Sequence, residues 1–82
     1  MLELRPNCEC CDQNLSPDSQ KAFICSFECT FCVDCVENVL NYICPNCKGN
    51  LVSRPIRPVA ALKNNPPSTT RVLKRDECVA NT

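Results

Sequence analysis

Cysteine spacing constrains this chain more than any other feature of its sequence. Nine of the ten cysteines lie in the first 47 residues, and pairs separated by two residues recur among them. A Cys-x-x-Cys pair can bind one zinc ion, because the two intervening residues turn the chain and direct both sulfurs to one point. Two such pairs complete a tetrahedral site of four thiolates, which is structural because no coordination position stays open. The spacing therefore predicts a domain folded around metal.

The chain has too few large apolar residues to fold without such help. It contains 82 residues, with 3 Phe, 1 Tyr and no Trp. A hydrophobic core is marginal at this size, and small domains usually need disulfides, a metal or a partner. No histidine occurs, so a catalytic cysteine or serine would lack an ordinary base, and we expect a protein that is not an enzyme.

Disulfides are the competing use of so many cysteines, and they require an oxidising compartment. Residues 1–8 have no basic start, apolar run or small-residue cleavage site, so we expect no secretion signal. No later segment approaches the roughly 18 apolar residues of a membrane span. We therefore expect a cytoplasmic protein with reduced thiols and no membrane partner. A disulfide framework stays open as the alternative.

Composition and charge both change after residue 53. Residues 1–53 carry seven acidic and three basic side chains, whereas residues 54–82 carry two acidic and six basic ones. Four of the seven prolines lie in the second segment, which has few apolar residues in a helical or strand period. Such a segment cannot bury enough surface to offset the entropy of ordering it. We predict a zinc-binding domain over residues 1–53 and a basic, mostly disordered tail over residues 54–82.

Short elements are predicted between the cysteines, which gives a small α+β domain with a β-hairpin and one short helix. Alternation at residues 2–5 predicts a short strand, residues 22–25 predict another, and residues 16–19 predict a turn. A helical stripe of Val36, Val39, Leu40 and Ile43 follows Asp34 as the N-cap, and Pro45 is expected to end the helix. Gly49 is expected to supply a positive φ in the last knuckle.

Residues 31–40, which read FCVDCVENVL, and residues 43–47, ICPNC, resemble the second half of the RING finger family. The likeness includes the aromatic residue before the fifth ligand and the proline after the seventh. It covers residues 8 to about 50 and implies a RING-like or treble-clef cross-brace with two zinc ions. The resemblance assigns one zinc to Cys8, Cys11, Cys32 and Cys35, and the other to Cys25, Cys29, Cys44 and Cys47. The whole chain, opening MLELRPNCECC, also resembles a family of short bacterial cysteine-rich proteins known only as a domain of unknown function.

The sequence departs from the RING pattern in ways that bear on function. Cys29 takes the place of the usual histidine ligand, and Glu9 and Cys10 stand where RING ligases have an apolar residue that docks the conjugating enzyme. Lys48 does match the basic residue that often follows the eighth ligand in such ligases. We therefore expect a non-catalytic module that binds an unidentified protein or has a regulatory role. The alternative is a ligase-like module that recruits a conjugating enzyme.

Other chemistry remains open at this point. Cys10 and Cys78 lie outside the eight ligands; Cys10 is a spare residue, an exchangeable ligand or a free thiol, and Cys78 is expected to be exposed. The run Cys29-x2-Cys32-x2-Cys35 is similar to an iron–sulfur motif, but eight residues separate it from the next cysteine. A metallothionein-like buffer and a single zinc site are further alternatives. Nucleic acid is a possible partner through the basic tail but is not favoured, because the first 53 residues are acidic.

Overall fold

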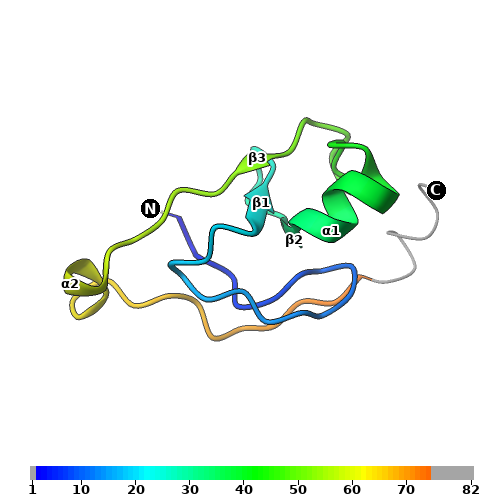
Figure 1. Ribbon diagram of the computed structural model, residues 1–82. Coiled ribbons are helices and arrows are strands. Elements are labelled where there is room, and N and C mark those ends of the chain that lie inside the picture. The colour runs from blue at the N-terminus through cyan, green and yellow to red at the C-terminus, as the bar shows by residue number, and fades with distance from the viewer. Residues whose placement is uncertain (1, 75–82) are drawn as a thin grey trace.

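A small antiparallel sheet forms the centre of the molecule. The computed structural model describes residues 2–74. Strand β1 (Ala22–Ile24) lies between β2 (Thr30–Cys32) and β3 (Val52–Ser53), and both neighbours run antiparallel to it (Figure 1). The strand predicted at residues 22–25 and the hairpin are therefore confirmed, and a third strand joins them. The predicted turn at residues 16–19 is also present, closed by the Ser19 N–H and the Ser16 carbonyl at 3.0 Å.

One helical segment follows β2 directly. It starts as α1 (Val33–Cys35) and continues as a π-helical turn, η1 (Val36–Leu40), in which the Asn41 N–H donates to the Val36 carbonyl. Val36 and Leu40 are buried against the core, as the apolar stripe predicted. Ile43 is 50% exposed, so the stripe ends before it and this part of the prediction is wrong.

The ends of the helix differ from the prediction. Cys32 is the N-cap and makes no side-chain cap, whereas Asp34 lies within the first turn. The helix stops at Leu40 rather than at Pro45, because Asn41 and Tyr42 take left-handed φ values of 52° and 63°. These two residues reverse the chain, so it reaches the last cysteine pair by a turn and not by a longer helix.

Cysteines make up much of the core. Seven of the thirteen residues in the main buried cluster are cysteines, and the apolar members are Leu15, Ala22, Phe31, Val36, Leu40 and Leu51. A core with so few aliphatic groups has little apolar surface to bury. This supports the expectation that a metal, a disulfide or a partner contributes to folding. None of the helices in residues 2–74 has the length and hydrophobicity that a membrane crossing requires.

The N-terminal residues do not form the predicted strand. Leu4 is buried, with 3% of its surface exposed, but its φ of 56° is incompatible with extended backbone. The segment instead lies beside the returning end of the chain, and the Ser68 N–H donates to the Glu3 carbonyl at 2.8 Å. Strand alternation at residues 2–5 was therefore a misleading signal.

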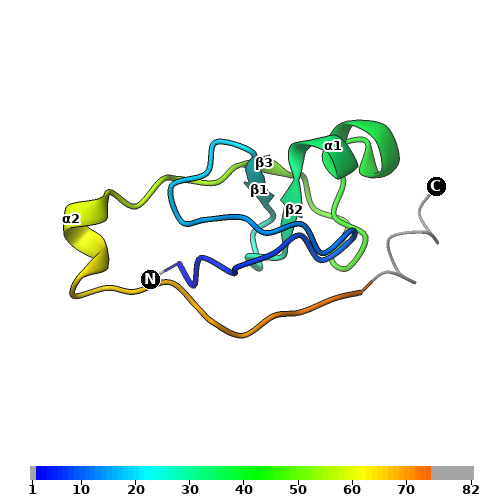
Figure 2. The same ribbon diagram turned by 60° about the horizontal axis from the view of Figure 1, so that its bottom comes forward.

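Residues 54–74, which we call the C-terminal arm, leave the sheet and return along the N-terminal segment. The arm runs from β3 to α2 (Val59–Leu62) at the far end of the molecule and then passes back alongside the N-terminal segment (Figures 1 and 2). Helix α2 has no buried residue. The arm gives the molecule its elongated shape of 38 × 20 × 19 Å.

Arginine side chains attach the arm to the rest of the chain. Arg54 is 4% exposed and donates to the carbonyls of Arg5 (3.0 Å) and Ser16 (2.8 Å). Arg57 donates to the carbonyl of Leu2 at 3.0 Å. Guanidinium groups thus bind backbone carbonyls along residues 54–57, contacts that no hydrophobic pattern reveals, and the mostly disordered tail over residues 54–82 stays a prediction. Residues 75–82, including Cys78, lie outside the described part of the chain.

Candidate metal centre

The first knuckle is a tight hairpin over residues 7–14 that presents two cysteines. The Asp12 N–H donates to the Cys8 carbonyl at 2.9 Å, and the Cys8 N–H donates to the Gln13 carbonyl at 2.8 Å. Asp12 has a φ of 67°, which turns the chain immediately after Cys11. Backbone geometry, rather than side-chain packing, therefore sets the direction of both sulfurs.

The second knuckle, residues 43–50, repeats this geometry. The Lys48 N–H donates to the Cys44 carbonyl at 2.9 Å, and the Cys44 N–H donates to the Gly49 carbonyl at 2.8 Å. The left-handed residue is Lys48, with a φ of 68°, and Gly49 has no positive φ. The role predicted for Gly49 is therefore wrong: in both knuckles the left-handed position is the residue directly after the second cysteine.

Four thiols converge between the first knuckle and the start of the helix. The sulfurs of Cys8, Cys11, Cys32 and Cys35 lie within 4.8 Å of one another. The first two come from the knuckle, while Cys32 ends β2 and Cys35 ends α1. The Cys11 and Cys32 sulfurs are 3.6 Å apart. We call these four residues the first cysteine group.

Three further thiols converge at the other end of the sheet. The sulfurs of Cys25, Cys44 and Cys47, the second cysteine group, lie within 4.8 Å of one another. Cys29 was predicted as the fourth member but does not meet this distance. It lies next to the group, where its thiol interacts with that of Cys25 and its sulfur accepts a bond from Asn46 Nδ2 at 3.4 Å.

Burial makes several of these thiols poor acids. Burial and the nearby sulfur of Cys8 raise the pKa of Cys32 to about 11. Burial and the thiol of Cys25 raise the pKa of Cys44 to about 12. Without a cation, these groups stay protonated at neutral pH. Convergent buried sulfurs are instead suited to a soft metal ion, whose charge replaces the protons.

Backbone N–H groups act in the opposite direction at the more exposed thiols. The Gly49 N–H lowers the pKa of Cys47, to whose sulfur it donates at 3.4 Å. At Cys11, burial raises the pKa, but the bond from the Gln13 N–H and the neighbouring thiols outweigh it, and the pKa is lowered. Each group therefore contains one thiol, Cys11 or Cys47, whose pKa is lowered.

A buried polar cluster beside the first group was not foreseen from the sequence. Glu9 is fully buried, and its Oε2 accepts bonds from Arg5 Nη1 at 2.9 Å and from the Thr30 N–H at 2.7 Å. The Glu9 N–H also donates to the Thr30 carbonyl at 2.9 Å. These bonds join the first knuckle to β2. The i, i+4 spacing of Arg5 and Glu9 was the sequence feature that could have indicated this ion pair.

Cys10 lies outside both cysteine groups. Cys10 is buried, with 8% of its surface exposed, and the eight free thiols do not include it. The hypothesis of a free Cys10 thiol is therefore not supported.

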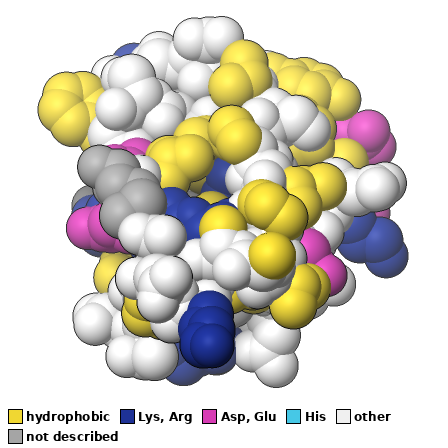
Figure 3. Space-filling model, turned by 90° about the vertical axis from the view of Figure 1, so that its left-hand side faces the viewer, with side chains coloured by type: hydrophobic (Ala, Val, Ile, Leu, Met, Phe, Trp, Pro, Cys, Tyr) yellow, Lys and Arg dark blue, Asp and Glu magenta, His cyan; other side chains and the backbone are white. Residues whose placement is uncertain are grey.

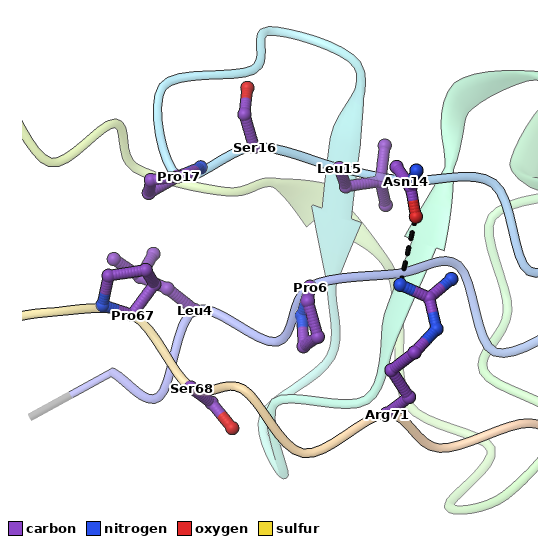
Figure 4. Close-up of a pocket in the computed structure, with 9 residues that line it drawn as sticks. All are labelled: Leu4, Pro6, Asn14, Leu15, Ser16, Pro17, Pro67, Ser68 and Arg71. Carbon is purple, nitrogen blue, oxygen red and sulfur yellow. Dashed lines mark hydrogen bonds between the residues drawn. The ribbon is translucent and has the colours of Figure 1, made fainter.

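A cavity of about 250 Å³ lies away from both cysteine groups. Its walls are Leu4, Pro6, Asn14, Leu15, Ser16, Pro17, Pro67, Ser68 and Arg71. Figure 4 shows the Arg71 guanidinium directed to Asn14, to which it donates at 2.8 Å. No cysteine lines this cavity, so it is separate from the candidate metal centre.

These features define a small α+β protein with two groups of converging cysteine thiols that could hold metal ions. The chain belongs to the family described as protein of unknown function DUF1272, whose family model matches residues 1–57. An uncharacterized protein of Rhizobium meliloti (strain 1021) is 62% identical over 78 residues, which cover 95% of this chain and 93% of that protein. No solved structure matches the chain. The predicted resemblance to a family of unknown function is thus confirmed.

Proposed function

We propose that this protein binds two zinc ions in structural four-cysteine sites and acts as a non-catalytic module for protein interaction or regulation. The observation that carries the zinc proposal is the convergence of thiols in two separate groups on knuckles of the same geometry. Four thiolates complete the tetrahedral coordination of zinc, which leaves no position for a catalytic water.

The order of the cysteines along the chain supports a RING-like cross-brace. The chain contributes to the two groups alternately: Cys8 and Cys11 to the first, Cys25 to the second, Cys32 and Cys35 to the first, and Cys44 and Cys47 to the second. Metal in one group therefore fixes segments that flank the other. The single zinc site considered above would leave one group of converging thiols unexplained.

Burial of the first knuckle favours a role other than that of a ligase. In RING ligases the residues between the first two ligands contact the conjugating enzyme. Here Glu9 is fully buried and Cys10 is 8% exposed, and the arm covers this loop, since the Lys74 N–H donates to the Glu9 carbonyl at 2.7 Å. This loop is therefore not available for docking in the way that the ligase alternative requires.

Exposed apolar side chains near the second group support a protein partner. Phe27 is 70% exposed and lies in the loop that carries Cys25. Tyr42 and Ile43, just before Cys44, are 45% and 50% exposed. Residues of this kind are enriched at protein interfaces.

The basic arm gives little support to nucleic-acid binding. Arg54 and Arg57 donate to backbone carbonyls, and Arg71 Nη2 contacts Asp12 Oδ1 at 2.8 Å. From the end of the molecule that faces the viewer in Figure 3, basic side chains are interspersed with hydrophobic ones and form no continuous basic surface. We expect no gel shift with RNA or DNA at low salt and micromolar protein.

Native mass spectrometry of the purified chain tests the zinc proposal directly. We expect two zinc ions per chain and loss of the fold when a strong chelator removes them, because metal binding supplies the folding free energy of such domains. One zinc per chain would leave a single site, and a coloured protein containing iron would replace zinc with an iron–sulfur cluster.

A further inference from the structure

The two cysteine groups are built differently. In the first group, all four sulfurs lie within 4.8 Å of one another, whereas the second group has three sulfurs at that distance. Cys29 precedes β2, in the loop that follows Glu28, whose φ is 65°. Cys29, the fourth ligand predicted for the second group, would therefore depend most on an additional contact to hold its sulfur near the other three.

Asn46 supplies such a contact. It lies inside the second knuckle, where its backbone N–H donates to Cys44 Sγ at 3.4 Å. Its side-chain Nδ2 donates to Cys29 Sγ, also at 3.4 Å. One residue thus contacts sulfurs from two segments that are far apart in the sequence.

The orientation of the Asn46 amide agrees with this role. Its Oδ1 is buried and has no hydrogen-bond partner among the described residues. The hydrogen bond that this amide makes to Cys29 is therefore donated by Nδ2 and not shared with Oδ1. A thiolate accepts hydrogen bonds and would repel the carbonyl oxygen. The nitrogen is therefore the atom that faces Cys29.

We infer that Asn46 is a positioning residue that holds Cys29 as the fourth ligand of the second group, and that this site releases its metal before the first. The inference rests on the proposed zinc function and deepens it. An N–H donor steadies the sulfur and disperses the negative charge that the thiolate brings to a site of four thiolates. Backbone N–H groups donate to sulfurs of both groups, from Cys10 to Cys8 Sγ and from Gly49 to Cys47 Sγ, each at 3.4 Å, and side-chain substitution does not remove these bonds. The bond to Cys29 Sγ differs because its donor is a side chain.

Substitution of Asn46 in the full chain tests the inference. Zinc-loaded wild type, Asn46→Ala and Asn46→Asp are titrated with chelators of graded affinity, and native mass spectrometry counts the forms with two, one and no zinc. We expect the zinc held by the second cysteine group of Asn46→Ala to bind about 10–100-fold more weakly, as is usual when a group that orients a ligand is lost. The zinc held by the first cysteine group should bind as in wild type. Asn46→Asp should weaken the second site more, because its carboxylate lies beside a thiolate.

Two further variants make the result interpretable. Asn38→Ala replaces an exposed asparagine on the helix and should match wild type. Cys29→Ser should lower the affinity of the same site as Asn46→Ala and of no other. Retention of the zinc held by the first cysteine group shows that each variant is folded.

The outcomes separate the inference from the function on which it rests. A wild type that binds fewer than two metal ions overturns the proposed function and the inference together. A wild type with two zinc ions and an Asn46→Ala variant with unchanged affinity overturns only the inference. Equal weakening of both sites in Asn46→Ala does so as well, since Asn46 would then act on the fold as a whole.

Discussion

Glu9 shows how a single residue can connect the first cysteine group to the sheet. Its carboxylate is fully buried next to Cys8 and is held by Arg5 and by the Thr30 N–H. Its Oε1 has no partner among the described residues, so the charge is only partly compensated. Removing one member of a buried, hydrogen-bonded ion pair is usually strongly destabilising, because the other member is left behind. This predicts that Glu9 is the least replaceable acidic residue of the described chain.

The first prediction concerns the order of three substitutions. Glu9→Gln keeps an acceptor for the Thr30 N–H but loses the charge that faces Arg5, which should cost about 1–3 kcal/mol in free energy of unfolding. Glu9→Ala removes both contacts and should cost more. Glu3→Gln removes a partner of the same arginine, but the Glu3 side chain is 54% exposed, so the cost should be below about 1 kcal/mol. Denaturant unfolding of the zinc-loaded protein measures all three, and a Glu3→Gln cost equal to that of Glu9→Gln would contradict the prediction.

The second prediction concerns protons. The pKa of Cys32 is raised to about 11 and that of Cys44 to about 12. Both groups are therefore protonated in the metal-free protein at pH 7, and zinc must displace their protons. Each displaced proton lowers the apparent affinity about tenfold for each unit by which pH falls below the pKa. Chelator competition at several pH values should show weaker binding at lower pH, and calorimetry in buffers of different ionisation enthalpy should show proton release. An affinity independent of pH would contradict the thiolate assignment.

At the scale of elements, the knuckles explain which sequence signals were reliable. The spacing of the cysteines predicted convergent pairs, and the resemblance to RING fingers implied how the pairs combine; the structure brings together all four thiols of the first group and three of the four in the second. The spacing did not predict the backbone between them. Asp12 and Lys48 are left-handed because they directly follow the second cysteine of a knuckle, so the position, rather than the residue type, sets φ. Glycine preference, which pointed to Gly49, was too general a rule for a turn closed by two backbone hydrogen bonds, from Lys48 to Cys44 and from Cys44 to Gly49.

The third prediction follows from this correction. A Cβ at Gly49 would meet Cys47 Sγ at 3.4 Å, an ordinary contact, and Gly49 needs no positive φ. Gly49→Ala should therefore leave zinc binding intact and change the free energy of unfolding by less than about 1 kcal/mol, with a gain expected from the smaller entropy of the unfolded chain. Thermal unfolding of the zinc-loaded variant measures the effect. Loss of the second zinc in Gly49→Ala would show that the glycine is required after all.

At the scale of the whole molecule, composition could not predict the contacts between the C-terminal arm and the first knuckle. The arm's prolines and scattered charges give no indication of specific contacts, and residues 71–74 contact the first knuckle. The fully buried Asn7 side chain donates to the Val72 carbonyl at 2.8 Å, and Arg71 contacts Asp12. These contacts are between polar groups distant in sequence, so neither periodicity nor hydrophobicity reports them. Because they surround Cys8 and Cys11, the arm should stabilise the first metal site.

The last prediction tests this coupling by truncation. A chain that ends at Asn65 loses every contact of residues 66–74 with the first knuckle, whereas a chain that ends at Lys74 keeps them and serves as the matched control. Loss of the two bonds between buried Asn7 and the Val72 backbone should cost about 1–3 kcal/mol, while the exposed pair of Arg71 and Asp12 adds little. Both chains should still bind two zinc ions, but in the shorter one the amides of residues 7–12 should exchange faster and the first zinc should be removed more readily by chelators. Hydrogen exchange with mass detection reads both effects. Equal protection of residues 7–12 in the two chains would mean that the arm follows the knuckle without stabilising it.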